Sequence, residues 1–238
     1  MKLLLLIFFL SLKSFSAEQD KIIGSNDLVT VSADGSNIPI RHKVLLNAIG
    51  LLSSRGCTVT HIGNGYALTA GHCFDATENL IKDQPCGDFT IAWGLRKGIS
   101  SYLESRCERI IAAQRSDLND FAIIRIYPEP DSAADLELNR KAAPGDELTV
   151  FSHSGHLSLQ WSKNCVVEAL TSSRLPKGSL NHKCDTDPGS SGAALIDTYT
   201  GKIVGIHAGG TSTGGGMNYG TFITNSEIAD ILRELGFK

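Results

Sequence analysis

Short β-prone runs, separated by turn residues, recur along most of the chain. Residues rich in β-branched, aromatic and aliphatic side chains occupy 57–62, 66–70, 89–93, 121–127, 147–151, 157–161 and 202–207. Turn sequences at 63–65 and 199–201 predict two β-hairpins, one joining 57–62 to 66–70 and one joining 193–196 to 203–206. Because many short strands with intervening turns are typical of barrels and sandwiches, the pattern predicts an all-β fold.

One helix is predicted at the C-terminal end of the chain. Apolar residues at 228, 231, 232 and 235 repeat with helical spacing. Thr224 and Glu227 have the spacing of a capping box at the helix start, and Gly236 follows as a stop signal.

Composition and charge narrow the class of protein. The chain has 238 residues, 42% hydrophobic and 20% charged, with 22 Lys and Arg against 25 Asp and Glu. The apolar content argues against disorder, and the net charge of −3 argues against a nucleic-acid partner. A polar stretch at 128–144 interrupts the strand pattern. We therefore expect an N-terminal β-barrel at 22–135 and, at 136–238, a C-terminal β-barrel with the helix.

The N-terminal residues predict export. Lys2 precedes an apolar run at 3–12, and Ser14 and Ser16 place small residues before a cleavage point. This is the pattern of a signal peptide, here 1–16. A membrane anchor would need about 20 apolar residues, so no membrane contact is expected after cleavage. We expect a secreted or periplasmic protein.

Six cysteines fit an oxidising compartment. They lie at 57, 73, 86, 107, 165 and 184, and none has the C-x-x-C spacing typical of zinc sites. Disulfides are therefore expected and a metal is not. Spacing alone leaves many connectivities open, among which we expect local, sequential pairs.

Three segments carry residues suited to catalysis. His72 follows a predicted strand beside Cys73, where an imidazole can act as a general base. Asp120 begins an apolar strand, so its carboxylate would be partly buried and would need a partner. Ser191 lies between glycines that permit a tight turn exposing the hydroxyl and pointing backbone N–H groups at one spot. Each residue alone has an ordinary structural interpretation, but chance coincidence of all three with these neighbours is improbable.

These motifs resemble those of the chymotrypsin-like serine endopeptidases. The matching segments are 69–73 for histidine, 120–122 for aspartate and 189–192 for serine, and the likeness covers about residues 22–236. The order His, Asp, Ser differs from that of subtilisins and α/β-hydrolases, and Ala193 replaces the last glycine of the hydrolase motif. The other histidines, at 42, 61, 153, 156, 182 and 207, lack this context, and all except the one at 207 are expected to be surface or structural.

The resemblance implies a fold and a mechanism. Two antiparallel six-stranded β-barrels would pack with the active site between them, His72 and Asp120 on the first and Ser191 on the second. Ser191 would form the acyl-enzyme, His72 would transfer the proton and Asp120 would orient the ring. Backbone N–H groups of Gly189 and Ser191 would form the oxyanion hole. Residues 208–210, which are Ala208, Gly209 and Gly210, would pair with a polypeptide substrate. No cofactor is implied, and we expect a monomer.

The substrate preference has two interpretations. His207 and Thr186 resemble pocket residues that bind the substrate carboxylate in the bacterial glutamyl endopeptidases, also called the V8-like branch, which favours Glu or Asp at P1. Asp185, six residues before Ser191, lies where trypsins carry the Asp that binds Lys or Arg, which favours the opposite charge. A non-catalytic secreted binding module on the same scaffold is a further alternative.

The resemblance also implies a zymogen and a disulfide pairing. Residues 22–27 resemble the mature N-terminus of the V8-like branch, so 17–21 would be a propeptide, cut after Lys21 to release an activating α-amine. The pairs would be Cys57 with Cys73, which resembles the bridge beside the family's histidine, Cys86 with Cys107, and Cys165 with Cys184.

Overall fold

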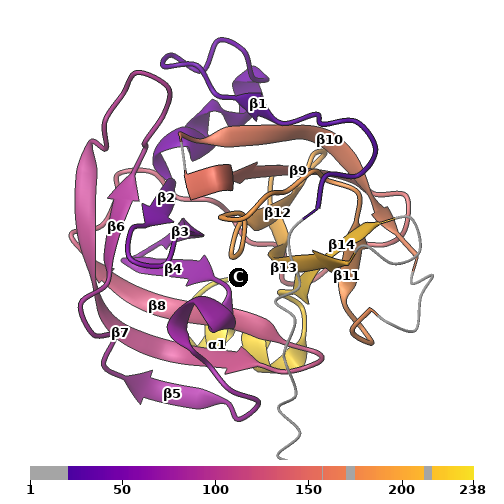
Figure 1. Cartoon of the computed structure of the whole chain (residues 1–238). Helices are drawn as coiled ribbons and strands as arrows, with labels where there is room; N and C mark the ends of the chain where they lie inside the picture. The colour runs from indigo at the N-terminus through magenta and orange to yellow at the C-terminus, as the bar shows by residue number, and fades with distance from the viewer. Residues whose placement is uncertain (1–20, 157, 170–174, 212–215) are drawn as a thin grey trace, which may run out of the picture.

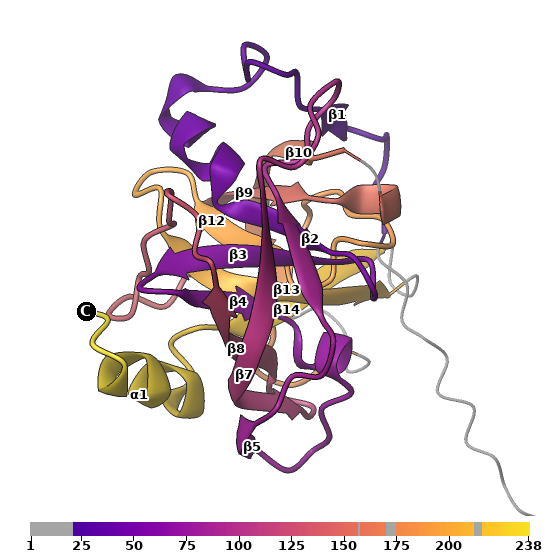
Figure 2. The ribbon, with the colours of Figure 1, turned by 90° about the vertical axis from the view of Figure 1, so that its left-hand side faces the viewer.

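A computed structural model describes residues 21–156, 158–169, 175–211 and 216–238 of the chain. The predicted signal peptide and nearly all of the predicted propeptide lie outside the described residues. Two antiparallel sheets make up most of the fold, and Figures 1 and 2 show them packed side by side. Among the described helices, none is long and apolar enough to cross a membrane.

The first sheet closes into a barrel of six strands. Their order is β7-β6-β2-β3-β4-β8, and β8 pairs with β7 to close the ring, while β5 adds to β7 outside it. The strands are β2 (Ile49–Leu52), β3 (Cys57–Gly63), β4 (Tyr66–Thr69), β5 (Ile81–Gln84), β6 (Thr90–Trp93), β7 (Leu103–Arg115) and β8 (Asp120–Tyr127). The hairpin predicted around residues 63–65 is confirmed as β3–β4.

The second sheet closes in the same way. Its ring runs β9-β10-β11-β14-β13-β12, and β12 pairs back to β9. The strands are β9 (Glu147–Ser152), β10 (Gln160–Glu168), β11 (Leu180–His182), β12 (Ala194–Asp197), β13 (Ile203–Thr211) and β14 (Met217–Phe222). The two predicted six-stranded barrels are therefore confirmed, as is the β12–β13 hairpin.

One short strand departs from the predicted division of the chain. Strand β1 (Val29–Thr30) falls in the segment assigned to the first barrel, but it pairs with β10 of the second. The reason lies just before it, where backbone N–H groups of Ile23 and Asp27 bond to Asp185, a residue of the second half of the chain. The N-terminal segment thus follows the second barrel before the chain enters the first.

Apolar side chains fill both barrels and the space between them. One cluster of buried residues spans the two units and includes Leu68 and Phe121 of the first barrel and Phe151 and Ile206 of the second. Burying such side chains stabilises the fold by roughly 1.5–3 kcal/mol each. The same contacts pack the two barrels against each other.

The C-terminal helix α1 (Ser226–Glu234) is confirmed, but its predicted start is wrong. Asn225 is the N-cap, and no side-chain capping hydrogen bond forms. Instead of closing a capping box, Glu227 Oε2 accepts a hydrogen bond of 2.7 Å from Asn119 Nδ2, next to Asp120. The apolar face of α1, which includes Ile228 and Leu232, joins the cluster between the barrels. Short 3-10 helices also occur, namely η1 (Ile40–Asn47), η2 (Gly71–Phe74) and η3 (Ser154–His156).

All three predicted disulfides are present. They join Cys57 to Cys73, Cys86 to Cys107 and Cys165 to Cys184. The first two lie within the first barrel and the third within the second. Two groups of cysteine and histidine side chains come close enough to suggest a metal site, one with His72 and one with His182. Their cysteines are the ones joined in disulfides, so they offer no thiolate to a metal.

Candidate active site

His72 and Asp120 form a double hydrogen bond where two strands of the first barrel end. His72 lies in η2, directly after β4, and Asp120 begins β8, the neighbour of β4. The Nδ1 atom of His72 lies 2.7 Å from Asp120 Oδ2, and the backbone N–H of His72 donates to Oδ1 at 2.9 Å. Because Nδ1–H donates to a carboxylate, Nε2 of the same ring is left to accept a proton.

Both residues are held by neighbours. The disulfide from Cys73 to Cys57 ties η2 to the start of β3. The backbone N–H of Asp120 donates to Thr221 Oγ1 at 2.8 Å, and Thr221 lies on β14 of the second barrel. The backbone of Asp120 is therefore held by the second barrel and its carboxylate by His72 of the first, and only 14% of the side chain is exposed.

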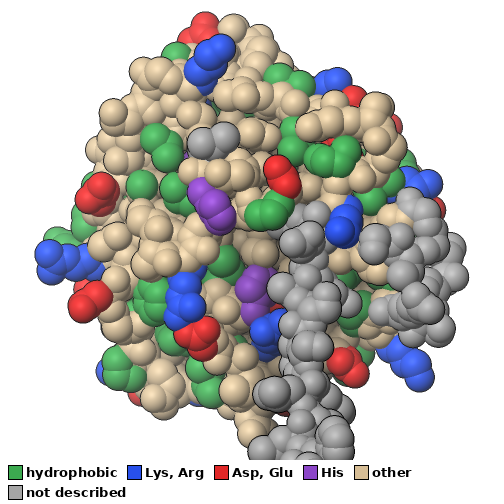
Figure 3. Space-filling model, in the orientation of Figure 1, with side chains coloured by type: hydrophobic (Ala, Val, Ile, Leu, Met, Phe, Trp, Pro, Cys, Tyr) green, Lys and Arg blue, Asp and Glu red, His purple; other side chains and the backbone are tan. Residues whose placement is uncertain are grey.

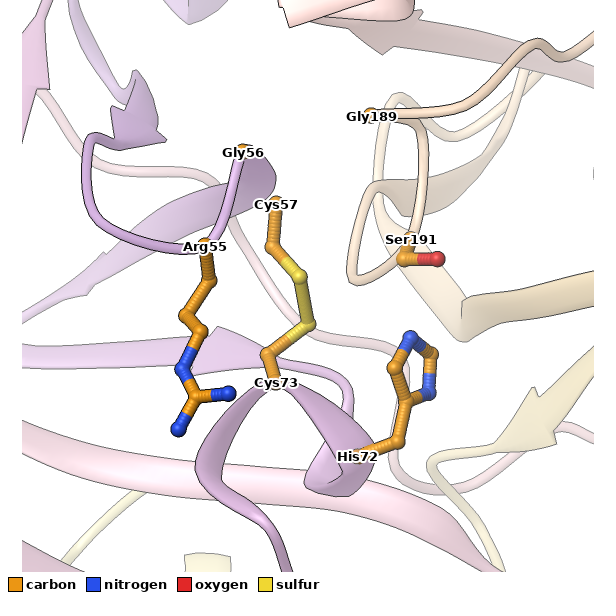
Figure 4. Close-up of a pocket in the computed structure, with 7 residues that line it drawn as sticks. All are labelled: Arg55, Gly56, Cys57, His72, Cys73, Gly189 and Ser191. Carbon is orange, nitrogen blue, oxygen red and sulfur yellow. A yellow bond between two sulfur atoms is a disulfide. The ribbon is translucent and has the colours of Figure 1, made fainter. Parts of the chain in front are cut away.

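Ser191 faces His72 across a small cleft. Figure 4 shows the imidazole of His72 directed toward the Ser191 side chain, with the Cys57–Cys73 disulfide beside them. The cleft has a volume of about 220 Å³ and is lined by Arg55, Gly56, Cys57, His72, Cys73, Gly189 and Ser191. The structure thus brings the three sequence-predicted residues together from two barrels.

The first barrel holds the backbone of the serine loop through Thr58. The N–H of Thr58 donates to Ser191 O at 2.9 Å, and its hydroxyl donates to Gly189 O at 2.7 Å. The second barrel contributes the bond from Gly192 N–H to His207 O, also 2.9 Å. These bonds attach the backbone of the serine loop to both barrels.

Gly189 has a conformation and surroundings that require glycine. Its φ is +106°, and a Cβ there would lie 2.4 Å from the carbonyl oxygen of His153. Within the described residues, the N–H groups of Gly189 and Ser191 donate to no acceptor, whereas Ser190 N–H donates to Asp187 O at 2.9 Å. Two unpaired backbone donors therefore flank one paired donor in this loop.

The Asp185 carboxylate binds the backbone of the N-terminal segment. Its carboxylate accepts hydrogen bonds from the backbone N–H groups of Ile23, at 2.7 Å, and Asp27, at 2.6 Å. The side chain is buried. Both carboxylate oxygens are thus satisfied by the chain itself.

Thr186 and Asn218 bind the backbone of Lys21. The N–H of Lys21 lies 3.2 Å from Thr186 Oγ1 and 3.1 Å from Asn218 Oδ1. Its carbonyl accepts from Thr186 N–H, at 3.1 Å, and from Asn218 Nδ2, at 2.7 Å. The N-terminal segment is therefore anchored beside the predicted specificity residues.

His207 lies on β13 and is buried against a second histidine. Its Nδ1 lies 3.1 Å from Nε2 of His182 on β11. Burial, and secondarily the charge of His207, hold the pKa of His182 well below its usual value. After His207, β13 continues through Ala208, Gly209 and Gly210 and pairs with β14, while its pairing with β12 ends at Ile206. One side of 208–210 is therefore unpaired with the described strands.

The face that carries this cleft has mixed charge. Figure 3 shows basic and acidic side chains interspersed over it, without a large area of one sign.

The comparisons with known proteins agree with this geometry. A family model described as "Trypsin-like peptidase domain" matches residues 56–206, more than half of the chain. The chain belongs to the trypsin-like peptidase family. It is a serine endopeptidase, as the sequence predicted, and its substrates are polypeptides.

Two solved structures similar to this trypsin-like peptidase support the fold. A Glu endopeptidase in complex with MPD is 17% identical, with a TM-score of 0.64, and the match covers 90% of this chain and 99% of that chain. A serine endoprotease from Yersinia pestis is 16% identical, with a TM-score of 0.57, over 83% of this chain and 68% of that chain. No curated protein sequence matches the peptidase.

Several residues of this site in the trypsin-like peptidase were missed in the sequence. His182 was expected to be merely surface or structural, yet it contacts His207. Thr58, Thr221 and Asn218 reach the site from strands distant in the chain, and no local motif marks them. Their roles depend on strand pairing, which the sequence pattern did not specify.

Proposed function

We propose that Ser191, His72 and Asp120 form the catalytic triad of this endopeptidase. The observation that carries the proposal is the double hydrogen bond between His72 and Asp120, with the imidazole directed at Ser191 across the cleft. In the first step, Ser191 Oγ attacks the scissile carbonyl carbon while His72 Nε2 accepts the hydroxyl proton. Asp120 keeps Nδ1 protonated and stabilises the imidazolium that forms.

The N–H groups of Gly189 and Ser191 would bind the oxyanion. Neither donates to another described group, so both are available to a negative oxygen above Ser191. The tetrahedral intermediate then collapses: the peptide C–N bond breaks, and the imidazolium of His72 gives its proton to the leaving amine. The acyl-enzyme is hydrolysed by water, with His72 again accepting and returning a proton.

The decisive experiment is labelling by a fluorophosphonate, which reacts only with an activated serine. We expect labelling at Ser191 and its loss in Ser191→Ala, together with loss of peptide hydrolysis. Ser162→Ala, which removes a buried hydroxyl of β10, is the matched control and should keep both. A folded wild-type protein that neither labels nor cleaves peptides would favour the non-catalytic binding module.

For the substrate, acidic P1 residues are the better-supported choice. His207 would donate a hydrogen bond to the substrate carboxylate, and its ring is oriented by the contact of 3.1 Å between its Nδ1 and Nε2 of the neutral, buried His182. Thr186 Oγ1 accepts from Lys21 N–H, so its own proton remains to donate to the same carboxylate. The trypsin-like alternative has less support, since both oxygens of Asp185 already accept backbone hydrogen bonds.

Residues 208–210 would pair with the substrate backbone. The side of β13 that no described strand covers begins after His207, next to Ser191. An extended peptide can add there as an extra strand, which would direct the scissile bond at the serine.

Maturation and export are proposed on the same structural basis. The chain would be secreted or periplasmic, because three disulfides are typical of an oxidising compartment. We also propose that it acts as a monomer. A propeptide cut after Lys21 would discard the four hydrogen bonds of that residue. A cut after Asp20 would keep them and present an α-ammonium to Thr186 and Asn218, so this position fits the contacts better than the cut predicted from the sequence.

A further inference from the structure

A ring of three buried serine hydroxyls lies directly behind the proposed nucleophile. Ser190 Oγ lies 3.0 Å from Ser152 Oγ and 2.8 Å from Ser154 Oγ, and those two oxygens are 2.9 Å apart. The backbone N–H of Asp187 also donates to Ser190 Oγ, at 3.2 Å. All three serines are almost fully buried. Ser152 ends β9 and Ser154 begins η3, so the ring joins the serine loop to a separate segment of the second barrel.

The three hydroxyls of the ring satisfy one another's hydrogen-bonding groups. Each hydroxyl can donate once and accept once within the ring, and Ser190 accepts the additional N–H of Asp187. Replacing one serine by alanine would leave the other two buried hydroxyls short of partners, which is costly away from water. The ring therefore opposes rotation of the Ser190 side chain and of the backbone that carries it.

The same two segments also fix the peptide planes of the proposed oxyanion donors. The carbonyl of Pro188 belongs to the peptide unit that carries Gly189 N–H, and it accepts from Gly155 N–H of η3 at 2.6 Å. The carbonyl of Ser190 belongs to the unit that carries Ser191 N–H, and it accepts from Ala193 N–H at 2.9 Å. Because N–H and C=O point in opposite directions in a trans peptide, holding each carbonyl from behind aims each N–H forward.

We propose that Ser190 and Ser154, completed by Ser152, are positioning residues for the oxyanion hole. This rests on the proposed roles of Ser191 and Gly189. Ser190 keeps η3 against the serine loop, so that Gly155 stays bound to Pro188 and Gly189 N–H stays directed at the reacting oxygen. The ring is uncharged, and none of its hydrogen bonds involves the N-terminal segment, which binds Asp185 and Thr186. The hole is therefore set by neutral hydroxyls of the second barrel, while the N-terminal segment acts on substrate binding.

The test compares Ser190→Ala and Ser154→Ala with Ser162→Ala in the full chain. Ser162 is the matched control because it is also buried and also makes two hydrogen bonds, to Val150 N–H and Lys163 O, neither of which belongs to the serine loop or to η3. Each variant is measured for kcat, KM, thermal unfolding and affinity for a peptidyl boronic acid. The boronate forms a tetrahedral adduct whose oxygen occupies the oxyanion hole.

We expect kcat to fall by about 10- to 100-fold in both ring variants, less than or near the loss seen when an oxyanion donor is removed outright. KM should stay within about 2-fold, and boronate affinity should fall in proportion to kcat/KM. In Ser162→Ala, the midpoint temperature of thermal unfolding should shift by about as much as in the ring variants, and kcat should be unchanged. If one of the two ring variants fails to fold, the other variant alone still tests the inference.

Unchanged kcat and boronate affinity in the ring variants would overturn the inference, as would failure of both variants to fold while Ser162→Ala folds. Fluorophosphonate labelling of the wild type separates this outcome from failure of the proposed function. If Ser191 labels and Ser191→Ala is inactive, the triad stands and only the positioning role is lost.

Discussion

The imidazole of His182 lies edge-on to that of His207, with Nε2 of the first 3.1 Å from Nδ1 of the second and the ring centroids 5.2 Å apart. Strands β11 and β13, which carry them, flank β14 in the second barrel. Burial holds the pKa of His182 well below its usual value, so His182 stays neutral beside the His207 ring. The contact with His182 fixes the orientation of the His207 ring.

Removing His207 should reduce cleavage after acidic residues selectively. His207→Ala is expected to lower kcat/KM for a Glu substrate by about 10-fold or more, because a hydrogen bond to a charged group is worth roughly 1.5–3 kcal/mol. A matched Gln substrate should lose much less. His182→Leu removes only the hydrogen-bond partner of His207 Nδ1 and should produce a smaller loss in the same direction, which His182→Gln partly restores. Equal losses on Glu and Gln substrates would contradict carboxylate recognition by this pair.

Replacing Asp185 should affect the N-terminal segment and not the P1 preference. Asp185→Ser removes the acceptor for Ile23 and Asp27 N–H, so the variant should unfold more easily by about 2 kcal/mol. Its kcat/KM ratio for Glu over Lys substrates should remain near that of the wild type. A wild-type preference for Lys or Arg that disappears in Asp185→Ser would instead establish the trypsin-like pocket.

The sequence predicted those parts of the fold that depend on local pattern. The β3–β4 and β12–β13 hairpins follow from apolar runs flanking turn residues, and α1 follows from its apolar spacing. Strand β7, the longest, was not predicted because its outward side chains, such as Glu104 and Arg106, are charged while alternate residues are buried. Strand β10 was predicted too early, at 157–161, whereas it runs over Gln160–Glu168 with a bulge between Trp161 and Asn164.

The residues of the site were also predictable only where a local sequence motif marks them. His72, Asp120 and Ser191 stand in short motifs whose neighbours serve them directly, such as Cys73 beside His72. Supporting residues such as Thr221 and Ser154 become recognisable only when strand pairing brings them to the loops they hold. A hydroxyl has no sequence context that distinguishes a buried ring member from a surface residue.

Loss of the Cys57–Cys73 disulfide should impair both stability and catalysis. The double variant Cys57→Ser with Cys73→Ser is expected to lose roughly 2–4 kcal/mol of stability, and it should lose kcat as η2 and His72 become less fixed. The control is Cys86→Ser with Cys107→Ser, which opens another bridge of the first barrel with a loop of similar length. If the loss of kcat, relative to the loss of stability, were the same in both double variants, a specific effect on His72 would be contradicted.

The residue at which the mature chain begins should change substrate affinity. Chains beginning at Ala17, Ile22 and Lys21 can be released from cleavable fusions and compared on a Glu substrate. The chain beginning at Lys21 should have the lowest KM, because it keeps the contacts to Thr186 and Asn218 and adds an ammonium there. The chain beginning at Ala17 should be poorly active. A fully active enzyme whose natural N-terminus is Ala17 would exclude a propeptide at 17–21.

Three buried histidines should make the fold acid-sensitive. Burial lowers the pKa values of His61 and His182, and burial together with the charge of Arg41 lowers that of His42 to about 4. In the unfolded chain each titrates near pH 6.5, so between about pH 6.5 and pH 4 the unfolded state binds more protons than the folded state. Stability should therefore be fully present above this window and be lost as pH falls through it.

His42→Phe isolates the contribution of one group. His42 packs beside the Phe151 ring, with centroids 5.6 Å apart, so phenylalanine fills a similar space without titrating. The free energy of unfolding, measured with urea in a Ser191→Ala background to prevent self-cleavage, should fall less from pH 7 to pH 4 in His42→Phe than in the parent. The difference should approach about 3 kcal/mol, because the pKa of His42 falls from 6.5 to about 4 on folding and one pKa unit corresponds to about 1.4 kcal/mol. A difference between variant and parent that stays constant over this range would show that His42 does not couple protonation to unfolding.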